Sequence, residues 1–287
     1  MTVNKISAAL RSRLSRMFTT AAFLCCFGMS YGAMAQAAGG TEVPRESARS
    51  ASALPDAPEP ASTDNEAVTL RGTPLRILKD QAAIWTSPLR IRKGDLVWLT
   101  PLAAATAVGI ATDHHAMASV VSHDAGFNSA SVNASNVLFG GFIAAPVALY
   151  GVGYLKGNEH ARETGLLSGE ALVDGLVVDE AMKLVFRRER PIVNNARGHF
   201  FEGNVSDSSF PSTHSVLAWS SAAVIAGEYP SKWAQVGIYT MATGVSLTRV
   251  MGQEHFPTDV LVGSAAGWLI GRYVFRAHHR HGLLPTR

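Results

Sequence analysis

The sequence predicts an all-α protein, an antiparallel helical bundle of about six core helices. Long apolar segments show helical spacing, whereas no run alternates apolar and polar residues over a useful length, so strands are not indicated. The connections between these segments are short, as they are between neighbouring antiparallel helices. Of the 287 residues, 47% are hydrophobic and only 16% are charged. A chain of this size and composition can bury one sizeable core, so we expect one main domain.

The first 35 residues have the pattern of an export signal. Basic residues open the chain, an apolar run follows over 18–29, and Ala33-Met34-Ala35 has the small residues of a cleavage site. The apolar run is shorter than the ~20 residues that span a bilayer, which favours a signal peptide at 1–35 over a membrane anchor. Both cysteines, Cys25 and Cys26, lie in this segment. The exported chain would therefore have no disulfide and depend on its core alone.

The basic character of the chain belongs to the same segment. The formal net charge is +3, and four basic residues stand in the signal before any acidic residue, namely Lys5, Arg11, Arg13 and Arg16. Without them, basic and acidic residues nearly balance. The composition therefore gives no support for nucleic-acid binding.

Residues 36–73 read as a disordered linker rich in Pro, Ala and Ser. The segment has few large apolar side chains and contains Pro44, Pro55, Pro58 and Pro60. Such a segment cannot bury enough surface to offset the entropy lost on ordering. The expected organisation is a signal peptide at 1–35, this linker at 36–73 and a helical domain at 74–287.

Three segments of the domain's first half are candidates for membrane contact. Residues 75–85 carry apolar side chains at helical spacing, and this stripe favours packing against the domain over lying on a membrane surface. Residues 96–112 and 125–155 are uncharged, and the second has an apolar centre at 137–155 interrupted by glycine and proline. Both are near the length that spans a bilayer. Membrane contact through 75–112 and 137–155 therefore stays open.

Four further helices are expected at 164–187, 214–228, 233–249 and 258–275. Pro230 ends the second of these, and Pro257 suits the first turn of the last. The helix at 164–187 carries Glu170, Asp174, Asp179 and Glu180 around its circumference. So many carboxylates would be costly against lipid, which argues against a bundle whose helices all span the membrane.

Cations, histidines and one carboxylate gather in three motifs at the ends of these helices. If consecutive helices run up and down, all three motifs lie at one end of the bundle, which we expect to hold the active site. The helices that begin near 214 and 258 point unsatisfied N–H groups to that end, which favours an anion. The residues that carry the pattern are Lys183, Arg190, Ser212, Thr213, His214, Arg249, His255 and Asp259.

The residue types suit the binding and transfer of a phosphate-like oxyanion. Arg190 and Arg249 offer planar forks for paired oxygens, and Lys183 a point charge. Lys183 and Arg190 share one helix face if the helix continues nearly to Arg190. His255 comes one turn before Asp259, near enough for the carboxylate to accept from one ring nitrogen and leave the other free to attack.

A second element of the site is the start of the helix near 214. Ser212 is expected to cap this helix and also to donate to a bound oxygen.

Taken singly, each site residue has an ordinary structural explanation, such as a Lys183–Asp179 ion pair one turn apart. The joint agreement of residue type, spacing and placement favours a site.

These motifs resemble the three-part signature of the type 2 phosphatidic acid phosphatase family, which includes bacterial nonspecific acid phosphatases and vanadium haloperoxidases. The resemblance covers roughly residues 135–275. It implies that His255 is the nucleophile that forms a phosphohistidine, that Asp259 orients it, and that His214 protonates the leaving oxygen. The phosphate-binding residues that it implies are Lys183, Arg190, Ser212, the backbone at Thr213, and Arg249.

The resemblance implies a phosphatase that hydrolyses phosphate monoesters at the periplasmic face of the cell envelope. Lipid phosphates, isoprenoid diphosphates and small soluble esters all remain candidate substrates, with no metal or other cofactor. Two alternatives remain: a haloperoxidase with vanadate as cofactor, and a noncatalytic lipid-phosphate-binding envelope protein.

The sequence departs from the family pattern at two positions. Thr213 stands where glycine is commonest, and Thr248 where serine is. A glycine there allows positive φ and a close backbone approach, so we expect Thr213 to reshape the pocket while activity is kept. The histidines of 113–115 and 278–281 are expected in a loop and a tail, with no metal-binding role.

Overall fold

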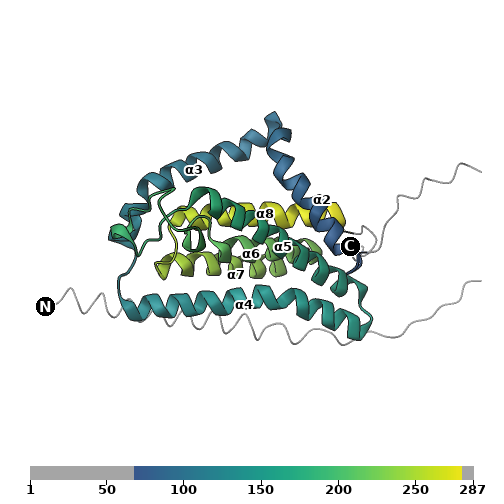
Figure 1. The fold of residues 1–287 in the computed structure, drawn as a ribbon. Coiled ribbons are helices and arrows are strands. Elements are labelled where there is room, and N and C mark those ends of the chain that lie inside the picture. The colour runs from purple at the N-terminus through teal and green to yellow at the C-terminus, as the bar shows by residue number, and fades with distance from the viewer. Residues whose placement is uncertain (1–67, 280–287) are drawn as a thin grey trace, which may run out of the picture. The chain divides into compact units, whose positions relative to one another are not determined.

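The structure, a computed structural model, describes residues 68–279, and over that range its regular secondary structure is helical, without strands (Figure 1). The predicted all-α fold is therefore confirmed. The predicted signal peptide at 1–35 and most of the linker lie outside the described residues, and the first helix begins at the linker's last position, Thr73. The α-helices are α2 (Thr73–Thr86), α3 (Leu96–His115), α4 (Ala125–Lys156), α5 (Glu159–Phe186), α6 (Thr213–Glu228), α7 (Lys232–Met251) and α8 (Pro257–His278).

Helix α6 is the centre of the bundle and packs against α4, α5, α7 and α8. Its small Ala and Ser side chains let neighbouring helices come close. The approach is closest to α8, where a Cβ added at Gly267 or Gly271 would collide with the α6 carbonyls of Val216 and Ser220. Larger residues at these two positions would force the helices apart.

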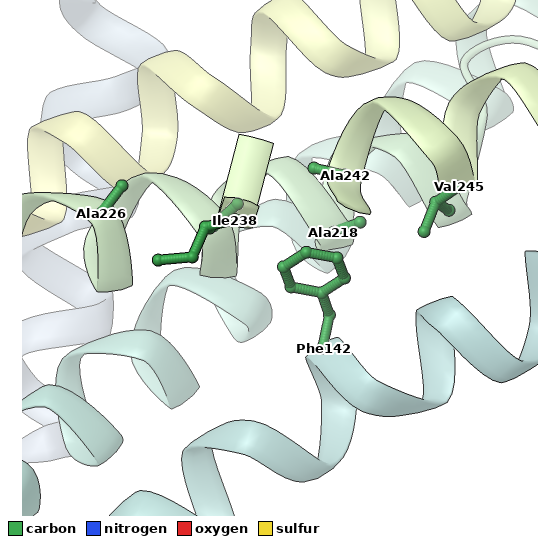
Figure 2. Close-up of a cluster of buried hydrophobic side chains, with 7 residues drawn as sticks. Phe142, Ala218, Ala226, Ile238, Ala242 and Val245 are labelled. Atoms are coloured by element: carbon green, nitrogen blue, oxygen red, sulfur yellow. The ribbon is translucent and has the colours of Figure 1, made fainter. Parts of the chain in front are cut away.

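A second set of contacts seals α6 against α4 and α7. The ring of Phe142 on α4 points into a cluster formed by small side chains of α6 and α7 (Figure 2). Partly buried Trp219 and Tyr239 stack beside this cluster, with ring centroids 5.5 Å apart. This cluster fixes the spacing between the long α4 and two helices of the predicted site, α6, which begins there, and α7, which ends there.

Two helices of the described part are long and apolar enough to cross a membrane, judged by length and composition alone. They are the continuous helical stretch Lys93–Val120, which contains α3, and Ala125–Lys156, which is α4. Both leave large apolar side chains exposed, including Val97 and Val108 on the first and Val137 and Val147 on the second.

Three of the four carboxylates of α5 lie inside the bundle, although the sequence placed them around the circumference of the helix. Glu170, Asp174 and Asp179 are buried, and only Glu180 of the four is exposed. The outward face carries apolar side chains, among them Val173 and Leu176. The carboxylates of α5 therefore give no argument against contact between the bundle and lipid.

The buried carboxylates of α5 explain how α2 is attached. Arg76 of α2 donates Nε to both oxygens of Glu170, at 3.0 and 3.1 Å. Gln81 donates to Asp174 Oδ1 at 2.8 Å. Burial raises the pKa of Asp174 to about 7, and the bond from Gln81 opposes that rise. Helix α2 thus packs against the domain as predicted, but through polar side chains. The stripe of apolar residues on which that prediction rested is wrong as the packing face, because Leu75, Leu78 and Trp85 are exposed.

One buried arginine ties the loop after α5 to two other helices. Helix α5 ends at Phe186, Arg187 adopts a left-handed backbone with φ of 38°, and Arg188 then turns into the protein. Its guanidinium forms ion pairs with Asp113 of α3 at 2.9 Å and with Asp259 of α8 at 2.7 Å. One cation thus pairs with two buried carboxylates from different helices.

The remaining sides of Arg188 are also occupied. It donates to Thr258 Oγ1 at 2.8 Å and to the Gly198 carbonyl at 3.2 Å. The rings of Phe256 and Phe200 lie 4.0 and 4.7 Å from its guanidinium carbon. A buried cation with this many hydrogen bonds and ring faces is compensated on every side.

Arg188→Met should therefore destabilise the protein by about 3–5 kcal/mol, because it leaves Asp113 and Asp259 buried without their common counter-ion. For a domain of this size the expected fall in Tm is roughly 10 °C. The exposed neighbour gives a matched control, and Arg187→Met should change Tm by far less. Equal Tm values for the two variants would contradict a central role for Arg188.

Candidate functional site

The three predicted motifs meet at one end of the bundle. The end of α5, the start of α6, the end of α7 and the start of α8 all contribute, as the up-and-down arrangement predicted. Burial lowers the pKa of His214, and the nearby Arg249, Lys183 and Arg190 lower it further. The pKa of His255 is affected by Arg249 and Arg190 as well, after burial and Asp259. The structure therefore brings the predicted cations and both histidines together.

At the start of α6, Ser212 differs from expectation in one respect. It is the N-cap residue of α6, yet its hydroxyl makes no capping hydrogen bond. The buried Oγ bonds to none of the described residues. Its backbone, in contrast, is engaged on both sides: the N–H donates to the carbonyl of Asp259 at 3.1 Å, and the carbonyl accepts from the Val216 N–H at 2.9 Å. The hydroxyl is thus held in place at the site with its hydrogen-bonding capacity unused.

Thr213 begins α6 with a φ that is not positive, so the position does not require glycine. Its hydroxyl donates to Asp179 Oδ2 at 2.8 Å and accepts from Lys183 Nζ. Lys183 also lies 3.0 Å from Asp179 Oδ2, the ion pair that one helical turn predicts. Burial raises the pKa of Asp179, and the Lys183 ammonium opposes that rise. The threonine side chain therefore helps to hold Lys183 at the site.

Arg190 lies beyond the end of α5, so it does not share a helix face with Lys183 as expected. The shared face required the helix to continue nearly to Arg190, but α5 ends at Phe186. Arg190 Nε donates to Asp207 Oδ1 at 2.6 Å, and Nη1 donates to Glu254 Oε2 at 2.8 Å. The residue is placed by loop contacts rather than by helical periodicity.

A single carboxylate oxygen lies between the two arginines of the site. Glu254 Oε2 accepts from Arg190 Nη1 at 2.8 Å and from Arg249 Nη2 at 3.2 Å. Arg249 Nε is buried with no hydrogen-bond partner among the described residues. Burial lowers the pKa of Arg249, and Glu254 opposes that effect. The two guanidinium groups thus converge on one anionic oxygen.

The ring of His255 is oriented by a backbone carbonyl rather than by Asp259. Its Nδ1 lies 2.8 Å from the carbonyl oxygen of Ser209, an acceptor only, so Nδ1 carries the proton. Asp259 Oδ2 is 3.8 Å from the same nitrogen, beyond hydrogen-bond distance. Nε2 therefore keeps its lone pair in this tautomer, as a nucleophile requires. Burial lowers the pKa of His255, and Asp259 opposes that effect.

Asp259 instead holds the structure around His255. One oxygen accepts from Arg188, and the other accepts from the Ser209 hydroxyl and from the Phe256 N–H at 2.8 Å. Ser209 therefore links the two residues, because its hydroxyl bonds to Asp259 while its carbonyl bonds to His255. The carboxylate acts on the histidine through this serine.

His214 is in contact with two residues of α4 that the sequence did not identify. Its Nε2 lies 3.2 Å from Asn136 Oδ1, and its ring centroid is 4.2 Å from that of Phe139. Burial lowers the pKa of His214 to about 3, with further contributions from nearby cations, of which Arg249 is the largest. The ring is therefore neutral until an anion offsets these charges.

Histidines away from the site also have partners, contrary to the expectation of a loop and a tail. His114 Nδ1 lies 3.1 Å from the Ala196 carbonyl. His278 lies 2.8 Å from Asp80 Oδ2, and His279 lies 3.0 Å from Glu228 Oε1. His281 lies outside the described residues.

Known proteins resemble the part of the chain that contains these motifs. Residues 164–283 match the model of the PAP2 superfamily. The chain is 33% identical over 134 residues to a lipid A 1-phosphatase of Porphyromonas gingivalis, a match that covers 45% of this chain and 27% of that protein. It is 32% identical over 124 residues to undecaprenyl-diphosphatase BcrC of Bacillus subtilis, covering 43% of this chain and 62% of that protein.

Two further similarities are more distant. An undecaprenyl-diphosphatase of Sulfolobus acidocaldarius is 28% identical over 116 residues, covering 40% of this chain and 54% of that protein. The chain thus spans less than two thirds of each of these curated relatives. A transmembrane PAP2 type phosphatidylglycerolphosphate phosphatase from Bacillus subtilis aligns with a TM-score of 0.45 at 19% identity, over 74% of this chain and 98% of that one.

The matched region contains every predicted site residue from Lys183 to Asp259, so the resemblance seen in the motifs is confirmed. The part of the chain that carries the candidate site, residues 164–283, is thus similar to the PAP2 superfamily.

Proposed function

We propose that this protein is a phosphatase that hydrolyses lipid-linked phosphate or diphosphate through a phosphohistidine intermediate. The observation that carries the proposal is a pair of buried donors without acceptors on two of the predicted site residues, together with a deprotonated imidazole nitrogen on a third. Ser212 Oγ and Arg249 Nε bond to none of the described residues, and His255 Nε2 carries a lone pair. Buried donors are normally satisfied, so this arrangement favours an oxyanion as the natural ligand.

The proposed reaction has two steps. His255 Nε2 attacks phosphorus and the ester P–O bond breaks, while His214 gives a proton to the departing oxygen. Water then attacks the phosphohistidine, His214 takes a proton from it, and the P–N bond breaks to release phosphate. Lys183, Arg190 and Arg249 would offset the charge on the phosphoryl oxygens in both steps.

Substrate binding would prepare His214 for this role. In the ligand-free site its pKa is about 3, because burial and nearby cations disfavour the imidazolium. A phosphate anion among those cations offsets part of their charge and raises the pKa of His214. Substrate binding would therefore favour the protonated form of the acid.

An apolar pocket near His214 supports a substrate with a hydrocarbon chain. The pocket has a volume of about 430 Å³ and is lined by α4, α6 and α7, with Leu138, Phe142 and Ala145 among its residues. Leu138 comes directly before Phe139, whose ring contacts His214. The lining extends along α4 to Val152, about 20 Å from Leu138 at the helical rise per residue. An extended lipid chain would fit beside a phosphate bound at the histidines.

Two other observations agree with a lipid substrate at a membrane. The two helices long enough to cross a bilayer include α4, which lines the pocket. The relatives are named as phosphatases of lipid A and of undecaprenyl diphosphate. We also propose that the signal at 1–35 exports the chain, so that the site faces the periplasm.

The division of labour between the histidines is testable by changing the leaving group. His255→Ala should abolish turnover of every ester, because the nucleophile is lost. His214→Ala should keep measurable activity on p-nitrophenyl phosphate, which expels a stable anion, and lose on the order of 10²-fold or more on alkyl phosphates. Rapid-quench labelling should trap an acid-labile phosphoryl group in the parent enzyme. A label that survives in His255→Ala would refute the assignment.

Glu254→Gln should strengthen inhibition by inorganic phosphate. The Glu254 carboxylate bonds to both arginines and would compete with a phosphate oxygen for them. Removing its charge should lower the inhibition constant of phosphate by roughly tenfold, equal to about 1.4 kcal/mol. Glu202→Gln, an exposed carboxylate on the loop, is the control and should leave inhibition unchanged. Weaker inhibition in Glu254→Gln would mean that the carboxylate orients the arginines instead of competing.

Filling the apolar pocket should separate lipid from soluble substrates. Ala145→Trp places a large ring in the pocket, so hydrolysis of long-chain phosphates should fall at least tenfold while p-nitrophenyl phosphate is still hydrolysed. Ala144 is exposed on α4 and does not line the pocket, so Ala144→Trp is the matched control. Steady-state kinetics on both substrates measure the difference. Parallel losses on both would contradict the chain-binding role.

A further inference from the structure

A second cluster of ligand-type side chains lies at the other end of the bundle. His160 and Glu163 come from the first turns of α5, Glu228 ends α6, and His279 follows α8. Helices α6 and α8 begin at the candidate site, so their lengths put this cluster roughly 25–30 Å from it. The cluster is therefore independent of the proposed phosphatase chemistry.

The four side chains converge from three helices. One ligand atom from each of Glu163, Glu228 and His279 lies within 4.8 Å of the other two. Glu228 Oε1 is 3.0 Å from His279 Nδ1, and Glu228 Oε2 is 3.6 Å from His160 Nδ1. The ring of Tyr229 meets the His160 ring edge-on at 5.0 Å. Two carboxylates and one imidazole thus converge, and a second imidazole lies beside the outer oxygen of Glu228.

The contacts within the cluster leave a buried oxygen without a proton donor. Glu228 is about 1% exposed, and within residues 68–279 its Oε2 forms no hydrogen bond. His160 Nδ1 is likewise buried without a hydrogen bond to the described residues, although it is the nearest ring nitrogen. A buried carboxylate oxygen left in this state is costly unless a cation satisfies it.

The distances suit a small divalent cation. In a tetrahedral site with bonds of about 2.0–2.1 Å, neighbouring ligand atoms are about 3.3 Å apart. The two measured histidine–carboxylate separations, 3.0 and 3.6 Å, fall on either side of that value. Two carboxylates also balance the charge of a dication when both imidazoles are neutral, the state that binds metal.

We propose that His160, Glu163, Glu228 and His279 form a binding site for a transition-metal dication of the Zn²⁺ type, which joins the ends of α5, α6 and α8. Imidazole and carboxylate ligands together favour such an ion over Mg²⁺ or Ca²⁺, which prefer oxygen ligands alone. The ion would stabilise the fold, since the site lies far from His255.

A neighbouring cluster at α2 differs from the proposed site, because its carboxylates are already paired. Asp80, Glu170 and His278 also lie within 4.8 Å of one another. Arg76, however, forms an ion pair with Glu170, and His278 bonds to both oxygens of Asp80. A cation there would face the Arg76 guanidinium, which gives a clear contrast for the experiment.

The test is Zn²⁺ binding by the full chain carrying no histidine tag, after treatment with a chelator. Calorimetry and metal analysis should show a tight Zn²⁺ equivalent, and Zn²⁺ should raise Tm by several degrees where the same concentration of Mg²⁺ does not. Glu228→Gln keeps the size of the side chain but removes a ligand. It should weaken Zn²⁺ binding by at least about 10²-fold and remove the rise in Tm. Even loss of a residue that only hydrogen-bonds to a metal ligand lowers metal affinity by about 10–100-fold.

Two controls and a second variant make the result decisive. Glu159→Gln changes an exposed carboxylate one residue from His160 and should leave Zn²⁺ binding intact, as should His278→Asn in the neighbouring cluster. His160→Asn, which is less buried than Glu228, should reproduce the loss if Glu228→Gln fails to fold. Absence of tight Zn²⁺ binding in the parent protein, or its loss in His278→Asn with retention in His160→Asn, would overturn the proposal.

Discussion

The buried ion pairs of Arg188 hold the candidate site together. This side chain neutralises Asp259 and Asp113 at once, and so connects the start of α8 to α3. Asp259 in turn fixes Ser209, whose carbonyl sets the tautomer of His255. A chain of short contacts thus runs from α3, a candidate membrane helix, to the nucleophile proposed for the reaction. Each link is buried, where a lost partner is costly to replace.

Much of the fold followed from apolar periodicity and helix-ending residues. The helix predicted at 214–228 is observed as Thr213–Glu228, and that at 233–249 as Lys232–Met251. The orientation of α5 did not follow, because its carboxylates and its apolar residues both recur at helical spacing. Which stripe faced inward depended on partners far along the chain, such as Arg76 for Glu170. No local pattern encodes such a pairing.

The candidate site shows the same division. The motif residues were found because their types and spacing are tied to helix ends, whereas the residues that orient them were not. Ser209 acts through its carbonyl, which any residue possesses, and Asn136 lies on α4, far from the motifs in sequence. Glu254 precedes His255 in the motif, but its hydrogen bonds to Arg190 and Arg249 depend on where the fold places both arginines. Likewise, the sequence did not show that the hydroxyl of Thr213, at a position where glycine is commonest, binds Lys183.

The place of Glu254 has a consequence for the end of a catalytic cycle. When phosphate leaves a site lined by two guanidinium groups, the cations must find new partners or remain exposed to one another, and either requirement slows departure. The carboxylate already stands between Arg190 and Arg249 in the ligand-free protein. It can therefore take over those contacts as the product departs, so that release becomes an exchange of one anion for another. An enzyme built this way would accept weaker binding of its product in return for faster turnover.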